Sequence, residues 1–525
     1  MLARVHTASL LGLTARRITV EVDLARGLPT FHLVGLPDGA VRESRERVTA
    51  ALKNSGFSLP VRRITVNLAP ADQPKSGSGF DLPIALAILE ADGSLVPGRP
   101  LAALGELALD GRVRPVRGVL PAAAALAQGG AEQVLVAQEN AREAALVRGL
   151  RSIPVGSLRS AVDHVSGLCP IEPAVSTSAR PSGEPGKDWD EVRGQAGARR
   201  ALEIAAAGCH NALLIGPPGA GKTFLARRLP TILPPLSEPE ALEVTAIHSA
   251  WGRLSAERPL VTSPPFRAPH HSISATALLG GGNPARAGEV CLAHRGVLFL
   301  DELPEFRRDA LEGLRQPIED GEILIGRARE RHRFPTRVLL VAAMNPCPCG
   351  WWGDDRRACV CTPGARRAYR GRVSGPLLDR IDLHVPFRSV PYLELVGGEQ
   401  AERSAAVLAR VEAARIRQRA RGDVNARLEP GMSAAGRSAG WARLDAEGRR
   451  LLAGAHDRMG ISARGHVRIL RVARTIADLD GRDAIEPSDL AEAIQYRILD
   501  RALEPCEPIR ERTTSTCRST STNDG

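Results

Sequence analysis

The stretch NALLIGPPGAGKTFLARRL, residues 211–229, decides the fold of this chain. An apolar, strand-like run leads into a glycine-rich loop and a helical pattern follows at once, which is the context that a P-loop requires. The glycines of such a loop let backbone N–H groups surround phosphates, and the helix N-terminus faces their negative charge. We therefore predict an ATP-binding loop made of Gly216, Pro217, Pro218, Gly219, Ala220, Gly221, Lys222 and Thr223.

The last two residues of this loop have separate predicted roles. Lys222 would contact the β- and γ-phosphates, and the hydroxyl of Thr223 would be a ligand of Mg²⁺. The alternative is an ordinary glycine-rich turn. It is disfavoured because the match falls on one of only four lysines in the chain, Lys53, Lys75, Lys187 and Lys222.

Two further apolar runs end in polar residues that suit the same site. GVLFLDELPEF, residues 296–306, ends its strand in Asp301 and Glu302. An acidic pair at the end of a strand beside a P-loop holds magnesium, here through Asp301, and polarises the attacking water, here through Glu302. RVLLVAAMNP, residues 337–346, ends in Asn345, whose neutral amide would orient the water without adding charge.

Two arginines complete the predicted series. Arg380, in SGPLLDRIDLHV, cannot lose its proton and has the forked geometry that fits phosphate oxygens. We expect it to act as a finger supplied to a neighbouring subunit. Arg464, in GISARGHVRILRVARTIADL, would report the nucleotide state to the C-terminal region. For each arginine taken singly, the alternative is a solvated or salt-bridged surface residue.

Length and composition predict several domains. A chain of 525 residues exceeds what one hydrophobic core usually supports. A run rich in Pro, Ser and Gly, residues 171–188, has the composition of a linker. The apolar runs around the P-loop favour a parallel sheet covered on both faces. We expect an α+β domain over 1–168, a linker over 169–188, an α/β core over 189–397, a helical part over 398–502 and a disordered tail over 503–525.

The N-terminal block contains two strand patterns and one helix pattern. RRITVEVDL, residues 16–24, and RRITVNLAP, residues 62–70, alternate β-branched residues with polar ones. Between them, a helix is predicted from a cap at Asp38 to Gly56, with Val41, Val48 and Leu52 on one face.

The whole series of motifs resembles the magnesium chelatase-like AAA+ ATPases of YifB/ComM type. The resemblance spans nearly the whole chain before the tail, and its most specific segments are GPPGAGKT, FRAPHHSISATALLGGGNPARAGEVCLAHRGVLFLDELPEF, LRQPIEDGEILIGR, AAMNPCPCG and GPLLDRIDL. It implies a P-loop AAA+ core with a C-terminal helical lid. Lys222 and Thr223 would be Walker A, Asp301 and Glu302 Walker B, Asn345 sensor 1, Arg380 the trans-acting finger and Arg464 sensor 2. It also implies homo-oligomeric rings, usually hexamers, and for ComM-type members DNA branch migration during natural transformation.

The N-terminal block resembles the Lon-protease-like domain of that family, which is of the ribosomal S5 domain 2 type. Lon proteases use a serine and a lysine. Here PKSGSGFD carries Ser76 and Ser78 one position away from the register of that serine, and Leu120 stands where the lysine would be. Because a leucine is no general base, we predict a domain without peptidase activity that serves interaction or ring organisation.

NPCPCGWWGDDRRACVCTPG, residues 345–364, holds four of the nine cysteines of the chain. Two C-x-C pairs can close one tetrahedral zinc site, made of Cys347, Cys349, Cys359 and Cys361. A labile disulfide and four free thiols are the alternatives. A structural zinc contributes roughly 10 kcal/mol of local folding energy. We expect that energy to hold Trp351 and Trp352 as an aromatic protrusion away from the ATPase core, where they contact DNA or a partner or else pack over the metal site.

GEILIGRARERHRF, residues 321–334, is a candidate DNA contact. It places arginines at every second position, namely Arg327, Arg329, Arg331 and Arg333, which on one strand would share a face. A solvated edge strand or loop is the alternative, and a turn within the stretch would break the shared face. His270 and His271, in APHHS, have no neighbouring ligands of suitable spacing, so we predict loop residues.

Charge and hydropathy set the remaining expectations. The net charge of +11 favours polyanions, although 66 arginines beside four lysines also fit a G+C-rich coding bias. No apolar run approaches the length of a membrane span and no signal peptide is recognisable, so we expect a cytoplasmic protein. The leading hypothesis is a ring-forming ATPase that remodels DNA as a branch-migration helicase. The alternatives are a magnesium-chelatase-type subunit and a protein-remodelling ATPase without a DNA substrate.

Overall fold

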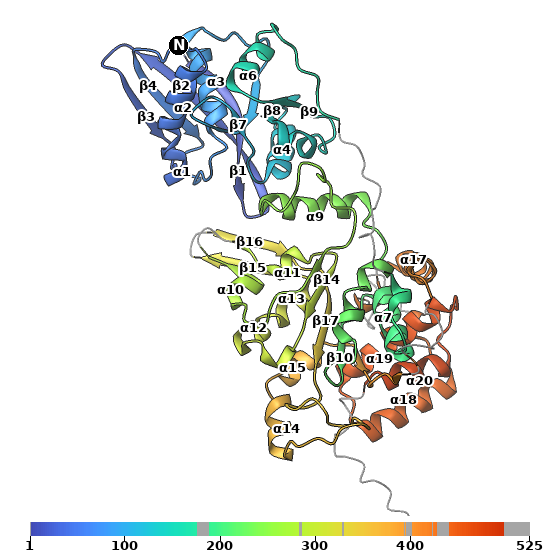
Figure 1. Cartoon of the computed structure of the whole chain (residues 1–525). Coiled ribbons are helices and arrows are strands. Elements are labelled where there is room, and N and C mark those ends of the chain that lie inside the picture. Colours follow the sequence, from blue (N-terminus) through green and yellow to red (C-terminus); the bar gives the residue numbers. More distant parts are fainter. Residues whose placement is uncertain are drawn as a thin grey trace, which may run out of the picture.

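The computed structural model describes residues 2–175, 188–282, 286–327, 330–392, 394, 402–422, 424–427 and 440–497. Figure 1 shows an N-terminal domain in blue, a central domain in green and yellow, and a helical part in orange and red. Most of the predicted linker and the whole predicted tail lie outside the described residues, so both stay predictions. No helix among the described residues combines the length and the apolar character that crossing a membrane requires.

The N-terminal domain is built on a seven-stranded sheet in the order β3-β4-β2-β1-β5-β8-β9. Its strands are β1 Leu2–Leu11, β2 Thr14–Ala25, β3 Thr30–Val34, β4 Arg63–Ala69, β5 Leu101–Leu104, β8 Gln133–Ala137 and β9 Arg151–Val155, with a separate pair β6 Glu106–Leu107 and β7 Val113–Arg114. Its helices are α1 Gly39–Arg42, α2 Ser44–Asn54, α3 Asp81–Asp92, α4 Val119–Gln128, η1 Gln138–Asn140, α5 Ala141–Ala144 and α6 Leu158–Val165.

The two predicted strands of this domain are confirmed, and they are neighbours. They form β2 and β4, which pair antiparallel with Val20 opposite Leu68. The predicted helix is present as two helices, α1 and α2, that meet at Glu43. Asp38 caps the first by accepting a 2.9 Å hydrogen bond from the N–H of Val41.

The central domain has a five-stranded sheet in the order β11-β14-β17-β10-β18, and all its neighbouring strands are parallel. Its strands are β10 Ala212–Ile215, β11 Phe266–Arg267, β14 Val297–Leu300, β17 Leu339–Met344 and β18 Leu383–Pro386, with two hairpins, β12 Gly280–Gly281 with β13 Arg286–Ala287 and β15 Glu322–Arg327 with β16 Glu330–Pro335. Its helices are η2 Trp189–Glu191, α7 Ala196–Gly208, α8 Lys222–Ala226, η3 Leu229–Ile232, α9 Glu238–Ala250, α10 Ala275–Leu279, α11 Glu289–Leu292, η4 Leu303–Glu305, α12 Arg308–Gly313, α13 Arg315–Asp320, α14 Pro363–Arg370 and α15 Gly375–Leu378.

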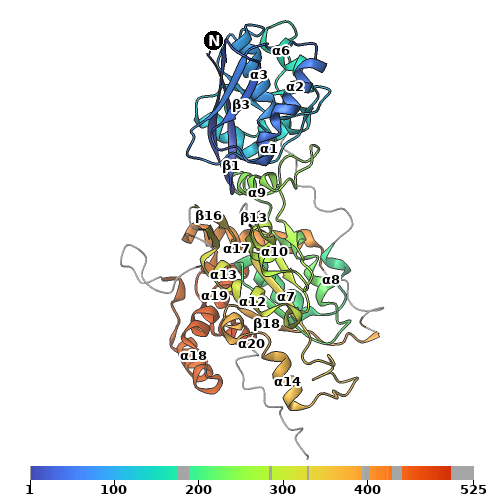
Figure 2. The same cartoon turned by 90° about the vertical axis from the view of Figure 1, so that its left-hand side faces the viewer.

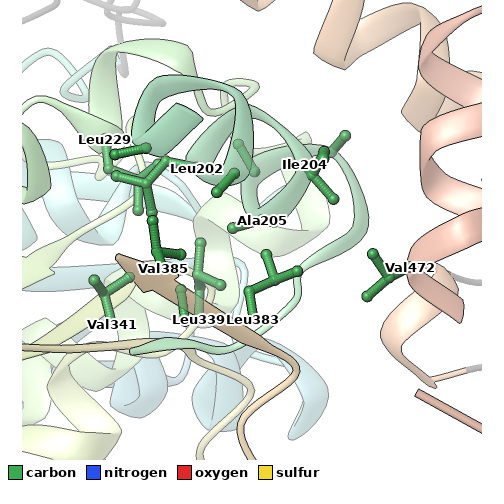
Figure 3. Close-up of a cluster of buried hydrophobic side chains, with 14 of the residues drawn as sticks. Leu202, Ile204, Ala205, Leu229, Leu339, Val341, Leu383, Val385 and Val472 are labelled. Carbon is green, nitrogen blue, oxygen red and sulfur yellow. The ribbon is translucent and has the colours of Figure 1, made fainter. Parts of the chain in front are cut away.

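The helical part packs directly on this domain. Its elements are α17 Ser404–Arg421, η5 Asn425–Arg427, η6 Gly440–Ala442, α18 Ala446–Met459, α19 Ala463–Leu479 and α20 Pro487–Gln495. One hydrophobic core joins the two parts (Figure 3): Leu202 and Ile204 of α7 lie beside Leu383 of β18, and Val472 of α19 faces them from the helical part. The sheet and the helical part therefore fold around shared apolar side chains.

Helix α9 lies between the N-terminal and central domains in both views (Figures 1 and 2). The carbonyl of Ser249 accepts a 3.0 Å hydrogen bond from the N–H of Gly118, at the start of α4. The Ser249 hydroxyl donates to the buried carboxylate of Glu143 in α5, which also accepts the N–H of Leu120 at 2.8 Å. The position predicted to lack the Lon lysine therefore lies within the contact between the two domains.

Candidate nucleotide site and cysteine site

The P-loop follows β10 at the carboxyl end of the parallel sheet. Gly219 and Gly221 have φ values of +76° and +90°, which favour glycine, and α8 begins at Lys222. The buried amino group of Lys222 donates to the carbonyls of Gly216 at 2.7 Å and Pro217 at 2.9 Å. It also donates to the amide oxygen of Asn345 at 3.1 Å. The predicted Walker A lysine and sensor 1 asparagine are therefore in contact.

The electrostatics of Lys222 suit an anionic ligand. Burial lowers the pKa of its amino group to about 8, although the carboxylates of Asp301 and Glu302 act in the opposite direction. Phosphate groups placed beside the amine would favour its charged form and raise this pKa again.

Thr223 and Asp301 meet beside the lysine. The Thr223 hydroxyl donates a 2.6 Å hydrogen bond to the Asp301 carboxylate. A hydroxyl and a carboxylate are the hard oxygen ligands that Mg²⁺ prefers, so this donor pair fits the expected ion. A bound Mg²⁺ would neutralise charge on the phosphates.

Glu302 has a partner that sequence reasoning missed. Its carboxylate lies 3.2 Å from Nδ1 of His271, whose ring is 4.1 Å from that of His270. The backbone of Glu302 is left-handed, with φ +53°, an uncommon conformation for a residue with a side chain. Both histidines lie in a loop, as predicted, but the loop reaches the candidate catalytic carboxylate. No spacing rule links a loop histidine to a distant strand end.

Arg380 lies at the opposite end of the sheet from the P-loop. Strands β18 and β10 pair in parallel with Leu383 opposite Ala212, and the Asn211 side chain donates to the Arg380 carbonyl at 3.1 Å. Gly216 is a strand length further on, about 13 Å away. The guanidinium of Arg380 pairs with Glu319 and donates to the Pro376 carbonyl at 2.7 Å. Arg380 is thus outside the nucleotide site of its own chain.

Arg464 lies on the same side as Arg380. Its guanidinium is 4.0 Å from the carboxylate of Glu319, and its side chain is 61% exposed. An ion pair fixes the positions of the two arginines relative to each other. Arg468, one turn after Arg464 in α19, pairs with the buried Asp382, two residues after Arg380. The structure therefore gathers seven of the predicted site residues into two groups: Lys222, Thr223, Asp301, Glu302 and Asn345 at one end of the sheet, and Arg380 and Arg464 at the other.

The four clustered cysteines converge on one point. All four sulfur atoms lie within 4.8 Å of one another. The Sγ of Cys347 is 3.4 Å from that of Cys349 and 3.6 Å from that of Cys359. A tetrahedral ion with Zn–S bonds of about 2.3 Å needs sulfur atoms about 3.8 Å apart, so the donor set fits zinc. The thiols of Cys347, Cys349, Cys359 and Cys361 would hold it, and it would cross-link the two ends of the loop.

The expectation of an aromatic protrusion away from the ATPase core is wrong. Gly350 packs on the P-loop so closely that a Cβ there would lie 2.6 Å from Cδ of Pro218. Trp351 and Trp352 are half-buried, and guanidinium groups of Arg357 and Arg370 lie 5.0 and 4.4 Å from their ring centroids. The loop stays close to the core because the first cysteine of the cluster, Cys347, lies only two residues after Asn345, which follows β17.

The arginine-rich stretch forms a hairpin, so the four arginines do not share one strand. Arg327 ends β15, whereas Arg331 and Arg333 lie on β16 and are exposed. Arg329 lies outside the described residues. The base of the hairpin is apolar, and Phe334 packs with Trp251 of the α9 end in an edge-to-face contact, 6.0 Å between ring centroids.

The fold and this site define a P-loop ATPase of the AAA+ class. Family models match three consecutive parts of the chain: magnesium chelatase, subunit ChlI, over residues 188–395; subunit ChlI of Mg-chelatase over 20–140; and the magnesium chelatase subunit ChlI C-terminal part over 401–497. With these matches and relatives that are 42 to 45% identical over nearly its whole length, the chain belongs to the magnesium chelatase-like AAA+ ATPases of YifB/ComM type.

Curated relatives match along almost their whole length. An uncharacterized protein of Mycobacterium tuberculosis is 45% identical over 94% of this chain and 98% of its own. The uncharacterized protein YifB of Escherichia coli is 43% identical over 96% and 98%, and the competence protein ComM of Haemophilus influenzae is 42% identical over 96% and 99%. A Lon protease of Rhizobium meliloti is 27% identical over 34% of this chain.

Proposed function

We propose that this chain is an ATP hydrolase that works as a closed ring, a hexamer by analogy with its family. One observation carries the proposal: the groups that would bind and activate ATP lie at one end of the central sheet, and the two arginines that would complete the site lie at the other. In a ring of identical protomers, Arg380 and Arg464 of one protomer would face Lys222 of the next. A site completed in this way is inactive in a lone chain.

The residues divide the work within such a site. Lys222 and the P-loop N–H groups hold the triphosphate, while Glu302 takes a proton from the attacking water that Asn345 orients. Arg380 of the adjoining protomer stabilises charge that develops on the γ-phosphate. An arginine in that role is worth about 10³ to 10⁵ in rate.

Mixing two inactive variants tests the shared site. Lys222→Ala removes the phosphate contact but keeps Arg380, and Arg380→Ala does the reverse. Each variant alone should hydrolyse ATP at least 10³-fold more slowly than wild type. Mixed rings should regain hydrolysis, because some interfaces pair an intact Lys222 with an intact Arg380. Mixed rings without recovery, or an Arg380→Ala protein of full activity, would refute the shared site.

We further propose that hydrolysis drives DNA remodelling of the branch-migration kind. The similarity to the competence protein ComM, the net charge of +11 and the exposed Arg331 and Arg333 support it. Contacts of such arginines with phosphates give salt-dependent binding with little sequence preference.

Two assays test the DNA substrate. ATP hydrolysis is measured with single-stranded DNA, fork DNA and no DNA, and branch migration with Lys222→Ala and Glu302→Gln as inactive controls. We expect stimulation by DNA, and its reduction in the Arg331→Ala, Arg333→Ala double variant. Hydrolysis that is indifferent to DNA would favour a protein-remodelling or magnesium-chelatase-type ATPase instead.

A further inference from the structure

A cavity of about 670 Å³ borders the P-loop on the side of α8. One wall is the loop itself, from Pro218 to Gly221, with Phe224 of α8. A second wall is the segment ahead of α7, including Val192. The third wall is Trp351, which comes from the cysteine loop.

This cavity adjoins the phosphate-binding residues, as the pocket for the base of a nucleotide has to. If the N–H groups around Gly219–Lys222 hold the phosphates, the sugar and base extend from them into adjoining open space. Another cavity, of about 890 Å³, touches the loop only at Gly216 and Pro217, whose carbonyls are already occupied by the amine of Lys222. The first cavity, in contrast, continues past the phosphate-binding residues to Phe224.

The lining of the first cavity suits a flat aromatic ligand. Phe224 and Trp351 are its two aromatic side chains among the described residues. Phe224 is 44% exposed, and the guanidinium of Arg228 lies 3.3 Å from its ring centroid. Aromatic side chains stack on any base because every base has a π-face.

The position of Trp351 is fixed by contacts on both sides of it in the chain. Before it, Gly350 packs on Pro218 of the P-loop. After it, the carboxylate of Asp354 accepts the N–H of Arg356 at 2.9 Å and the hydroxyl of Ser389 beyond β18. The flanking cysteines converge as described above. These contacts hold the backbone at Trp351 beside the P-loop, and the side chain lines the cavity.

We propose that Trp351 stacks on the base of the nucleotide bound at the P-loop, which makes the cysteine loop a part of the nucleotide site. The proposal rests on the proposed function in one respect, that ATP binds through Lys222. Trp352 is the matched control, because the neighbouring tryptophan lines the other cavity and packs on Arg370.

The test compares two ligands with the full-length chain. Affinities for ATP and for inorganic tripolyphosphate, both with Mg²⁺, are measured for wild type, Trp351→Ala, Trp351→Leu, Trp351→Phe and Trp352→Ala. Loss of the ring should weaken ATP binding about tenfold and leave tripolyphosphate binding unchanged. Trp351→Phe should recover most of the affinity, and Trp352→Ala should resemble wild type. Trp351→Leu keeps an apolar side chain in place, so it serves if the alanine variant does not fold.

Each contrary result has one meaning. Wild-type ATP affinity in Trp351→Leu and Trp351→Ala would overturn the stacking. Equal losses for ATP and tripolyphosphate would overturn it too, because the damage would then lie in the P-loop. A different result would show that ATP does not bind through Lys222. In that case Lys222→Ala would bind ATP as tightly as wild type, whatever the affinities of the tryptophan variants.

Discussion

The amine of Lys222 donates to two carbonyls and one amide oxygen. These three contacts hold the amine beside the loop whose N–H groups would surround the phosphates. The same burial lowers its pKa to about 8, which brings its titration into an experimentally accessible range.

ATP affinity should fall as the pH rises through 8. Only the protonated amine attracts phosphate, and the free protein loses that proton above its pKa of about 8. Binding at pH 9 should be about tenfold weaker than at pH 7, because one pKa unit corresponds to a tenfold change in the charged fraction. Equilibrium titration with a fluorescent ATP analogue measures this. The residual binding of Lys222→Ala should show no such slope, and a flat wild-type profile would contradict the assigned pKa.

Glu302→Gln should separate binding from hydrolysis. The amide cannot accept the proton of the attacking water, so turnover should fall about 10² to 10⁴-fold. ATP affinity should stay close to that of wild type, because Glu302 makes none of the P-loop contacts. Glu305→Gln is the control: this nearby carboxylate pairs with Arg372 near the surface and should leave turnover unchanged. Equal turnover in Glu302→Gln and wild type would remove Glu302 from the mechanism.

At the scale of elements, periodic patterns were predictable and long-range partners were not. The alternation of Ile18, Val20 and Val22 identifies β2 because one face of a sheet must be buried. The P-loop and the strand ends that carry Asp301 and Asn345 could be predicted because their motifs lie within short, continuous stretches of sequence. The pairing of Arg380 with Glu319, the approach of His271 to Glu302 and the return of the cysteine loop to Pro218 depend on tertiary packing. No local signal in the sequence encodes them.

The cysteine cluster should bind one zinc ion per chain. Four thiols within one coordination sphere form a complete ligand set for a structural site. Metal analysis of protein purified without added zinc should give a ratio near one. Cys359→Ser should lose the ion, whereas Cys291→Ser, at a buried thiol elsewhere in the central domain, should keep it. A ratio far below one in wild type would favour free thiols or a disulfide.

At the scale of the whole molecule, α9 joins the N-terminal domain to the ATPase. Ser249 contributes two of the hydrogen bonds across this contact, one through its carbonyl and one through its hydroxyl to Glu143. Burial raises the pKa of Glu143, and the donors around its carboxylate oppose that effect.

Ser249→Ala should weaken the domain contact. It removes one donor to a buried carboxylate, which costs about 1 to 3 kcal/mol of stability. Thermal unfolding and the rate of limited proteolysis between the domains report the change. Ser94→Ala, at an exposed serine of the N-terminal domain, should alter stability by less than about 0.5 kcal/mol. If Ser249→Ala were as stable as Ser94→Ala, the hydrogen bond from Ser249 to Glu143 would contribute nothing to the stability of the domain contact.

The buried setting of Leu120 limits which side chains can stand at this position. Its N–H donates to the carboxylate of Glu143, and the residue is 5% exposed at the contact with α9. A lysine introduced at this place would bury an ammonium group at the contact between the two domains instead of presenting it to a peptide. A charged side chain at position 120 would reach solvent only if the contact made by α9 opened, so the docking of α9 restricts this position to apolar side chains.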